Sequence, residues 1–77
     1  MSAGLWNAET RAFDGGALRR AIVARAWTTP EFARAARMNP ASLYNALRGR
    51  PVRDATAIRI FDTLEKRPPM VVALVGA

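Results

Sequence analysis

The segment TTPEFARAARMNPASLYNALRGRP, from Thr28 to Pro51, concentrates side chains that can recognise another molecule by hydrogen bonding. Its hydroxyl, amide and guanidinium groups serve as donors and acceptors, and the chain has no Cys and no His beside them. Arginine adds a planar fork that matches phosphate groups and the edge of guanine. These side chains can therefore bind an anionic partner non-covalently.

The charge balance of the whole chain favours the same kind of partner. Twelve Lys and Arg residues against six Asp and Glu give a formal net charge of +6 and a sequence pI near 11.6, and Lys66 is the only lysine among them. A domain this basic commonly binds a polyanion. The alternative is a basic surface without a partner, since arginine-rich composition also follows from a GC-rich genome.

The sequence offers little for catalysis or for cofactor binding. Without Cys and His, thiolate and imidazole metal sites and the most common general base are missing. The acidic residues are scattered over different expected elements and form no carboxylate pair: Glu9, Asp14, Glu31, Asp54, Asp62 and Glu65. There is also no Gly-rich phosphate loop. We therefore expect a protein that is not an enzyme and that needs no cofactor or metal.

Nothing in the sequence indicates transport to a membrane. Residues Met1 to Ala12 lack the basic start and apolar run of a signal peptide. The longest apolar stretch, Met70 to Val75, is too short to span a bilayer. The lack of Cys fits a reducing compartment. The expected location is the cytoplasm, with no membrane partner.

Two short helices are expected back to back in the central segment. Thr28 and Glu31 match a capping box, so one helix should cover Thr29 to Ala36. Asn39 is a good N-cap for a second helix, which Gly49 should end in a left-handed conformation. Two short helices joined by a three-residue turn predict a helix-turn-helix, which places its second helix in the major groove of DNA.

Two longer helices should flank this pair. Residues 17–27 show an apolar face of Leu18, Ile22 and Ala26, with Val23 and Trp27 beside it. Residues 54–66 form the other, which Asp54 can cap or complement in charge, with Ala57, Ile60, Phe61 and Leu64 inward. Arg19, Arg20 and Arg59 are expected to face solvent.

The two ends of the chain differ from this helical middle. Residues 1–16 are expected to be an arm, in which one or two helical turns would align Trp6, Thr10 and Phe13. Residues 17–67 are expected to form a helix-turn-helix DNA-binding domain, and residues 68–77 are expected to form an apolar tail with a short strand. The expected fold is all-α, a compact four- to five-helix domain with a short C-terminal strand.

The stretch from Leu18 to Leu64, LRRAIVARAWTTPEFARAARMNPASLYNALRGRPVRDATAIRIFDTL, resembles the helix-turn-helix family of Cro and the lambda-type repressors, often called XRE-like. Within that family, SLYNALRG followed by a helix and an apolar terminal strand is similar to HigA-type antitoxins. The sequence departs from the family at Arg37, where Gly is common. An arginine can hold the left-handed conformation there at a cost of about 1 kcal/mol.

The resemblance implies specific roles for residues of the second short helix and its surroundings. Contacts to base edges are implied for Asn39, Ala41, Ser42, Tyr44, Asn45 and Arg48. Contacts to phosphates are implied for Thr28, Thr29, Arg48, Arg50 and Arg53. The alternatives are that Asn39 is only a cap and that Tyr44 covers the edge of the core. The candidate dimerisation residues are Met70, Val71, Val72, Ala73, Leu74 and Val75, which could pair as strands across a two-fold axis.

The function expected from these features is transcriptional regulation through double-stranded DNA. A phage- or mobile-element-type repressor would bind a palindromic operator as a homodimer, because one helix reads only a few base pairs. An antitoxin that binds a toxin and represses its own operon is the first alternative. A protein-interaction module whose basic face binds an acidic protein is the second.

Overall fold

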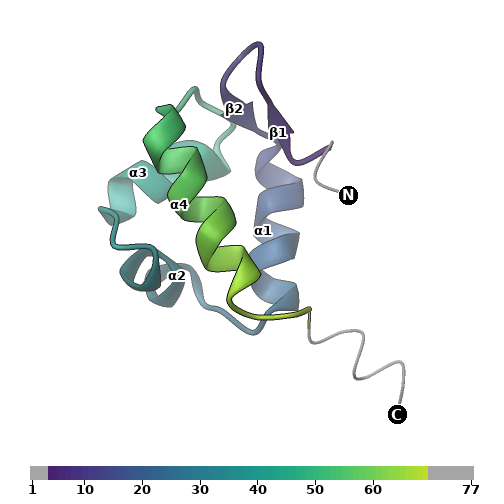
Figure 1. The fold of residues 1–77 in the computed structure, drawn as a ribbon, viewed down its shortest axis with the longest axis vertical. Coiled ribbons are helices and arrows are strands. Elements are labelled where there is room, and N and C mark those ends of the chain that lie inside the picture. The colour runs from purple at the N-terminus through teal and green to yellow at the C-terminus, as the bar shows by residue number, and fades with distance from the viewer. Residues whose placement is uncertain (1–3, 70–77) are drawn as a thin grey trace.

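The computed structural model describes residues 4–69, which form four helices and a short two-stranded sheet (Figure 1). The strands are β1 (Trp6–Asn7) and β2 (Ala12–Phe13), and the helices are α1 (Gly15–Ala24), α2 (Thr29–Ala35), α3 (Pro40–Leu47) and α4 (Asp54–Glu65). In Figure 1, α4 crosses in front of the other helices, with α1 on one side and α2 and α3 on the other. No helix within residues 4–69 is long and apolar enough to cross a membrane.

A single core draws on every helix and on the second strand. Its buried apolar residues are Phe13, Leu18, Ile22, Phe32, Ala33, Ala36, Leu43, Ala46, Leu47, Ala57, Ile60 and Leu64. The inward residues expected in the helix at 54–66 are confirmed, with Phe61 only partly buried. Thr63 is also buried, which the apolar pattern does not predict; its hydroxyl donates to the carbonyl oxygen of Arg59, 2.8 Å away.

The segment before α1 is a β-hairpin, so the prediction of helical turns there is wrong. The strands pair antiparallel, with Trp6 opposite Phe13. The side chain of Asn7 accepts hydrogen bonds from the backbone N–H groups of Glu9 and Thr10, at 2.9 and 3.2 Å. Because this Asx turn satisfies backbone donors locally, the chain reverses direction where a helix would have continued.

Helix α1 begins and ends earlier than its apolar pattern indicates. Asp14 caps its first turn by accepting from the N–H of Ala17 at 3.0 Å, so both glycines that follow Asp14 are helical. At the other end, Ala26 lies beyond the helix with a φ of 61° and is exposed. Val23 is 66% exposed. The expected inward position of Ala26 is therefore wrong, because the helix stops at Ala24, and Val23, expected beside the apolar face, lies on the exposed side of α1.

The other helix boundaries agree with the sequence to within about one residue. Asn39 is the N-cap of α3, and Gly49 holds the expected left-handed conformation with a φ of 75°. Arg53 is the N-cap of α4 and makes no side-chain capping bond, so Asp54 lies in the first turn and does not cap. The predicted strand from Met70 to Val75 lies outside the described residues.

Candidate nucleic-acid interface

The start of α2 is fixed by the expected capping box. The hydroxyl of Thr28 accepts from the N–H of Glu31 at 3.3 Å, and the Glu31 carboxylate accepts from the backbone N–H and the hydroxyl of Thr28 at 3.1 and 3.0 Å. These two bonds to the carboxylate, the backbone one first, lower the pKa of Glu31 below its ordinary value of 4.5. The hydroxyl of Thr28 is therefore already engaged within the domain, while Thr29 next to it is half-buried.

The turn between α2 and α3 has a defined hydrogen-bonded form. Arg37 takes a φ of 56°, which confirms the left-handed position expected from the sequence. The N–H of Arg37 donates to the carbonyl of Arg34, and that of Met38 donates to the carbonyl of Ala33. This pair of bonds is the Schellman motif, which satisfies the last carbonyls of a helix. The angle between the two helices is thus held by backbone bonds.

A side chain from α4 braces the same turn. The Arg59 guanidinium donates to the carbonyl oxygen of Arg37, 3.0 Å away. Arg59 is exposed, as expected from the sequence, and it makes this backbone bond in addition. The pattern of residues in α4 does not predict this bond, because the acceptor is a backbone carbonyl far away in the sequence.

Helix α3 has one buried and one exposed face. Leu43 and Ala46 are fully buried against the rest of the domain. Facing outward are five of the residues that the family resemblance assigns to base edges: Asn39, Ala41, Tyr44, Asn45 and Arg48. Ser42, the sixth, is half-buried. Tyr44 is 46% exposed, so part of its side chain is open to solvent.

Both ends of α3 are closed by local hydrogen bonds. At its start, the side-chain oxygen of Asn39 accepts from the N–H of Ala41 at 2.9 Å, while the amide N–H groups of that side chain are not needed for the cap. At its end, Gly49 donates to the carbonyl of Ala46, and Arg50 donates to the carbonyl of Asn45 at 3.0 Å. A second Schellman motif therefore positions the backbone of Arg50 directly after the helix.

A surface pocket joins the side of α3 to the start of α4. Ser42 and Asn45 line it together with Arg53 and Thr56, and Pro51 and Val52 complete it. The structure thus brings together three residues that the sequence assigned to base or phosphate contacts. Thr56 is an additional polar residue here that the sequence analysis missed, because the helical pattern of residues 54–66 alone does not show which polar position meets α3.

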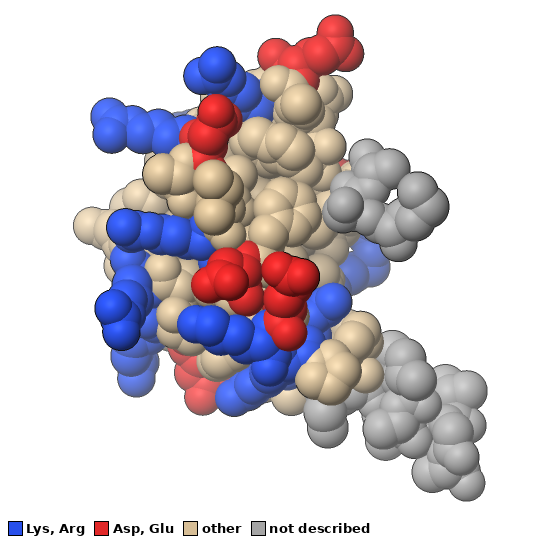
Figure 2. Space-filling model, in the orientation of Figure 1, with Lys and Arg blue, Asp and Glu red and all other residues tan. Residues whose placement is uncertain are grey.

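The basic candidates for phosphate contact surround the C-terminal end of α3. Arg48 caps the helix, Arg50 follows the left-handed glycine, and Arg53 precedes α4, and all three are exposed. Figure 2 shows Lys and Arg side chains gathered along the flank over α2 and α3, whereas acidic side chains gather in the middle of the face that α4 crosses. On the face shown, the positive charge is therefore unevenly distributed.

Other arginines serve the fold. The guanidinium of Arg25 donates to the carbonyls of Leu64 and Ala21, each at 3.0 Å, and so ties α1 to the end of α4. Arg67 lies 3.6 Å above the centre of a Trp27 ring and donates to the carbonyl of Ala26 at 3.3 Å. Contacts inside the domain hold these two side chains in place, which distinguishes them from the exposed arginines around α3.

Within residues 4–69 there is no group of three or more acidic side chains that could hold a metal ion. What the described geometry provides is a surface of hydrogen-bonding and cationic side chains on a helix with fixed ends. Comparison with protein families, with characterised proteins and with solved structures found no match to this chain.

Proposed function

We propose that the chain is a sequence-specific DNA-binding regulator of transcription, in which α2, the turn at Arg37 and α3 act as a helix-turn-helix. The observation that carries the proposal is the division of α3 into two faces. Leu43 is fully buried, whereas Asn45 and Tyr44 are exposed on a helix whose two ends are capped. A short rigid helix with free amide, phenol and guanidinium groups suits the reading of base edges in the major groove.

In this proposal the exposed residues of α3 divide the work of recognition. Asn45 forms a bidentate pair with adenine, Arg48 reaches guanine, and Ala41 meets a thymine methyl group. Arg50 and Arg53, at the end of α3 and the start of α4, bind the sugar-phosphate backbone and fix the register of the helix. The concentration of basic side chains on the same flank supports this division (Figure 2).

The proposal includes a homodimer on a palindromic operator. One α3 helix, Pro40–Leu47, can reach only a few base pairs, so a second copy related by a two-fold axis supplies the other half-site. In this proposal the protein acts as a repressor of the phage or mobile-element type, and its occupancy of the operator depends on its own concentration.

Selection of bound duplexes from a random DNA pool tests the proposal. The wild-type chain should enrich a palindromic motif whose half-sites lie about 10 base pairs apart. Arg19→Ala, an exposed change on α1, should enrich the same motif, whereas Asn45→Ala should lose the preference at one position of each half-site. An unchanged motif with Asn45→Ala would overturn the role of Asn45 in base recognition, and no enriched motif with the wild type would overturn the proposal.

A further inference from the structure

The β-hairpin is fastened to the loop that carries two of the proposed phosphate contacts. The N–H of Val52 donates to the carbonyl oxygen of Arg11 at 2.8 Å, and Ala12 forms an antiparallel bridge with Pro51. Val52 lies between Arg50 and Arg53 in the sequence. The backbone of Arg11 is therefore held beside that pair of arginines, although it is far from them along the chain.

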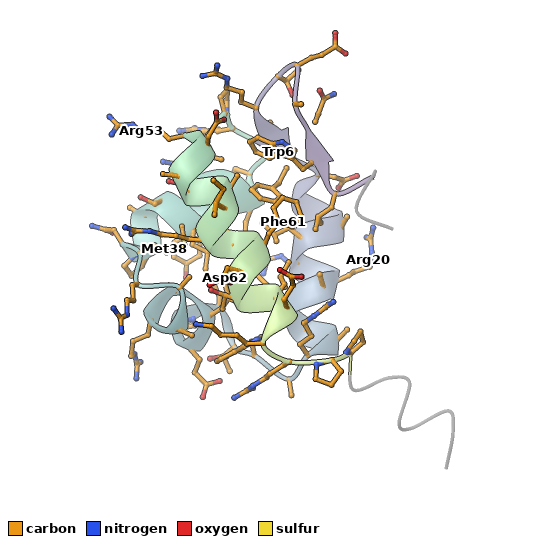
Figure 3. The ribbon with its side chains drawn as sticks, in the orientation of Figure 1. Trp6, Arg20, Met38, Arg53, Phe61 and Asp62 are labelled. Atoms are coloured by element: carbon orange, nitrogen blue, oxygen red, sulfur yellow. The ribbon has the colours of Figure 1, made fainter. Side chains whose placement is uncertain are left out.

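The hairpin has a firm base. The ring of Phe13 is buried and lies 4.9 Å from the ring of Trp6 and 5.5 Å from that of Phe61 on α4, measured between centroids. Figure 3 shows Trp6 and Phe61 facing one another where the hairpin meets α4. Aromatic contacts of this kind add stability beyond the area that they bury. The hairpin is therefore held in place by the core of the domain.

Arg11 itself has an imposed backbone conformation. Its φ is 56°, a left-handed value that costs a non-glycine residue about 1 kcal/mol. Such residues persist where the surrounding contacts determine the conformation, and here the bond from Val52 and the turn closed by Asn7 provide them. The side chain of Arg11 is exposed. The Arg11 side chain is thus a cation held at the surface, and it takes no part in the core.

The position of Arg11 differs from that of basic residues on the opposite side. In Figure 3, Arg53 projects outward from the flank that carries α3, whereas Arg20 on α1 projects from the other flank. Arg11 is joined through the Val52 bond to the loop before Arg53. Two exposed acids of this region would oppose an anion: Glu9 in the same turn and Asp54 directly after Arg53.

We infer that Arg11 is a further phosphate-contacting residue and that the β-hairpin positions it on the DNA backbone beside Arg50 and Arg53. The inference rests on the proposed DNA-binding function and extends it to an element outside the helix-turn-helix. Because phosphates carry no sequence information, this contact adds affinity and fixes orientation without changing the preferred operator.

Salt-dependent binding to DNA of mixed sequence tests the contact without knowledge of the operator. The full chain and its variants are titrated against a fluorescent mixed-sequence duplex of about two helical turns at several salt concentrations. Binding of this kind depends on phosphate contacts, so the slope of log K against log salt counts them. Arg11→Gln should reduce the magnitude of the slope by about 0.9. Arg11→Lys should keep the wild-type slope, and so should the control Arg20→Gln.

An increase in DNA affinity provides a second test of the contact, because misfolding would not produce such an increase. Glu9→Gln removes a negative charge from the same turn, so it should tighten binding about twofold at low salt. The effect should vanish at high salt, where charges further apart than a few ångströms are screened. Unchanged affinity of Glu9→Gln at low salt would count against the inference, even if Arg11→Gln impaired folding.

The outcomes separate the inference from the function on which it rests. If Arg50→Gln has a shallower slope but Arg11→Gln has that of the wild type, the hairpin contact is wrong and DNA binding stands. If the wild-type chain does not bind the duplex even at low salt, the proposed function fails and the inference fails with it. Circular dichroism of each variant verifies the helical content.

Discussion

The guanidinium group of Arg59 on α4 donates a hydrogen bond of 3.0 Å to the carbonyl oxygen of Arg37, the left-handed residue between α2 and α3. Helix α4, which follows α3 in the sequence, therefore stabilises the turn that precedes α3. This bond couples the orientation of α3 to the packing of α4. A substitution in α4 can therefore alter the proposed recognition surface without lying on it.

Removal of that brace should weaken the domain. Arg59→Ala should lower the free energy of unfolding by about 1 kcal/mol, the usual net value of one hydrogen bond, because the carbonyl of Arg37 loses its partner. Urea denaturation measures the change. The matched control is Arg19→Ala, an exposed arginine on α1, which should change stability by less than about 0.5 kcal/mol. Equal effects of the two variants would show that the brace contributes nothing.

The left-handed turn itself should become more stable with glycine. Arg37→Gly and Ala26→Gly should each raise the free energy of unfolding by about 0.4–1 kcal/mol, because glycine adopts a φ near 60° without a steric penalty. Ala21→Gly, inside α1, should instead lower it by about 1 kcal/mol. Urea midpoints compare the three variants. A destabilised Arg37→Gly would mean that its side chain supports the turn in a way that the backbone conformation does not reveal.

The neighbouring glycines at the start of α1 should respond in opposite ways to alanine. A Cβ on Gly15 would overlap the backbone carbonyl of Leu47, so Gly15→Ala should cost about 1–3 kcal/mol as α1 and α3 are forced apart. A Cβ on Gly16 would lie 3.3 Å from the end of the Arg20 side chain, which can move, and 3.6 Å from the Asp14 carboxylate, an ordinary contact distance. Gly16→Ala should therefore gain up to about 1 kcal/mol from helix propensity. Thermal unfolding of both variants decides whether the close approach at Gly15 is real.

The capping box at Thr28 should make stability depend on pH. The folded-state pKa of Glu31 lies below its ordinary value of 4.5, so the charged carboxylate stabilises the fold above pH 4.5. That contribution should be lost as the pH falls through the lowered pKa. Glu31→Gln keeps the shape but not the charge, so its urea midpoint should fall below that of the wild type at pH 6 and approach it in acid. A difference between the two that stays constant with pH would contradict the assignment.

Two residues assigned to different tasks should give different binding defects. Asn45→Ala removes a proposed base contact and should cost about 1–3 kcal/mol on the best operator but little on unrelated DNA. Arg50→Ala removes a proposed phosphate contact, so it should weaken binding to all sequences and lower the salt slope by about one. Titrations against operator and scrambled duplexes at several salt concentrations measure both. Should Asn45→Ala lose specific and non-specific binding alike, α3 would not be the reading helix.

The features that could be predicted from the sequence depend on contacts between near neighbours. The capping box of Thr28 and Glu31, the N-cap at Asn39 and the left-handed Gly49 each involve residues within about one turn of one another. Side-chain type and spacing therefore determine where α2 and α3 begin and end. The same periodicity indicates which side of α3 is buried, and so which residues are candidates for recognition.

The features that only the tertiary structure decided depend on partners that are distant in the sequence. Nothing near Arg11 indicates that its carbonyl will accept from Val52, and nothing near Arg59 indicates a bond to Arg37. Ala26 takes a left-handed conformation without glycine because the chain must turn from α1 into α2. At Arg11 and Ala26 the packing of the neighbouring elements outweighs about 1 kcal/mol of backbone strain.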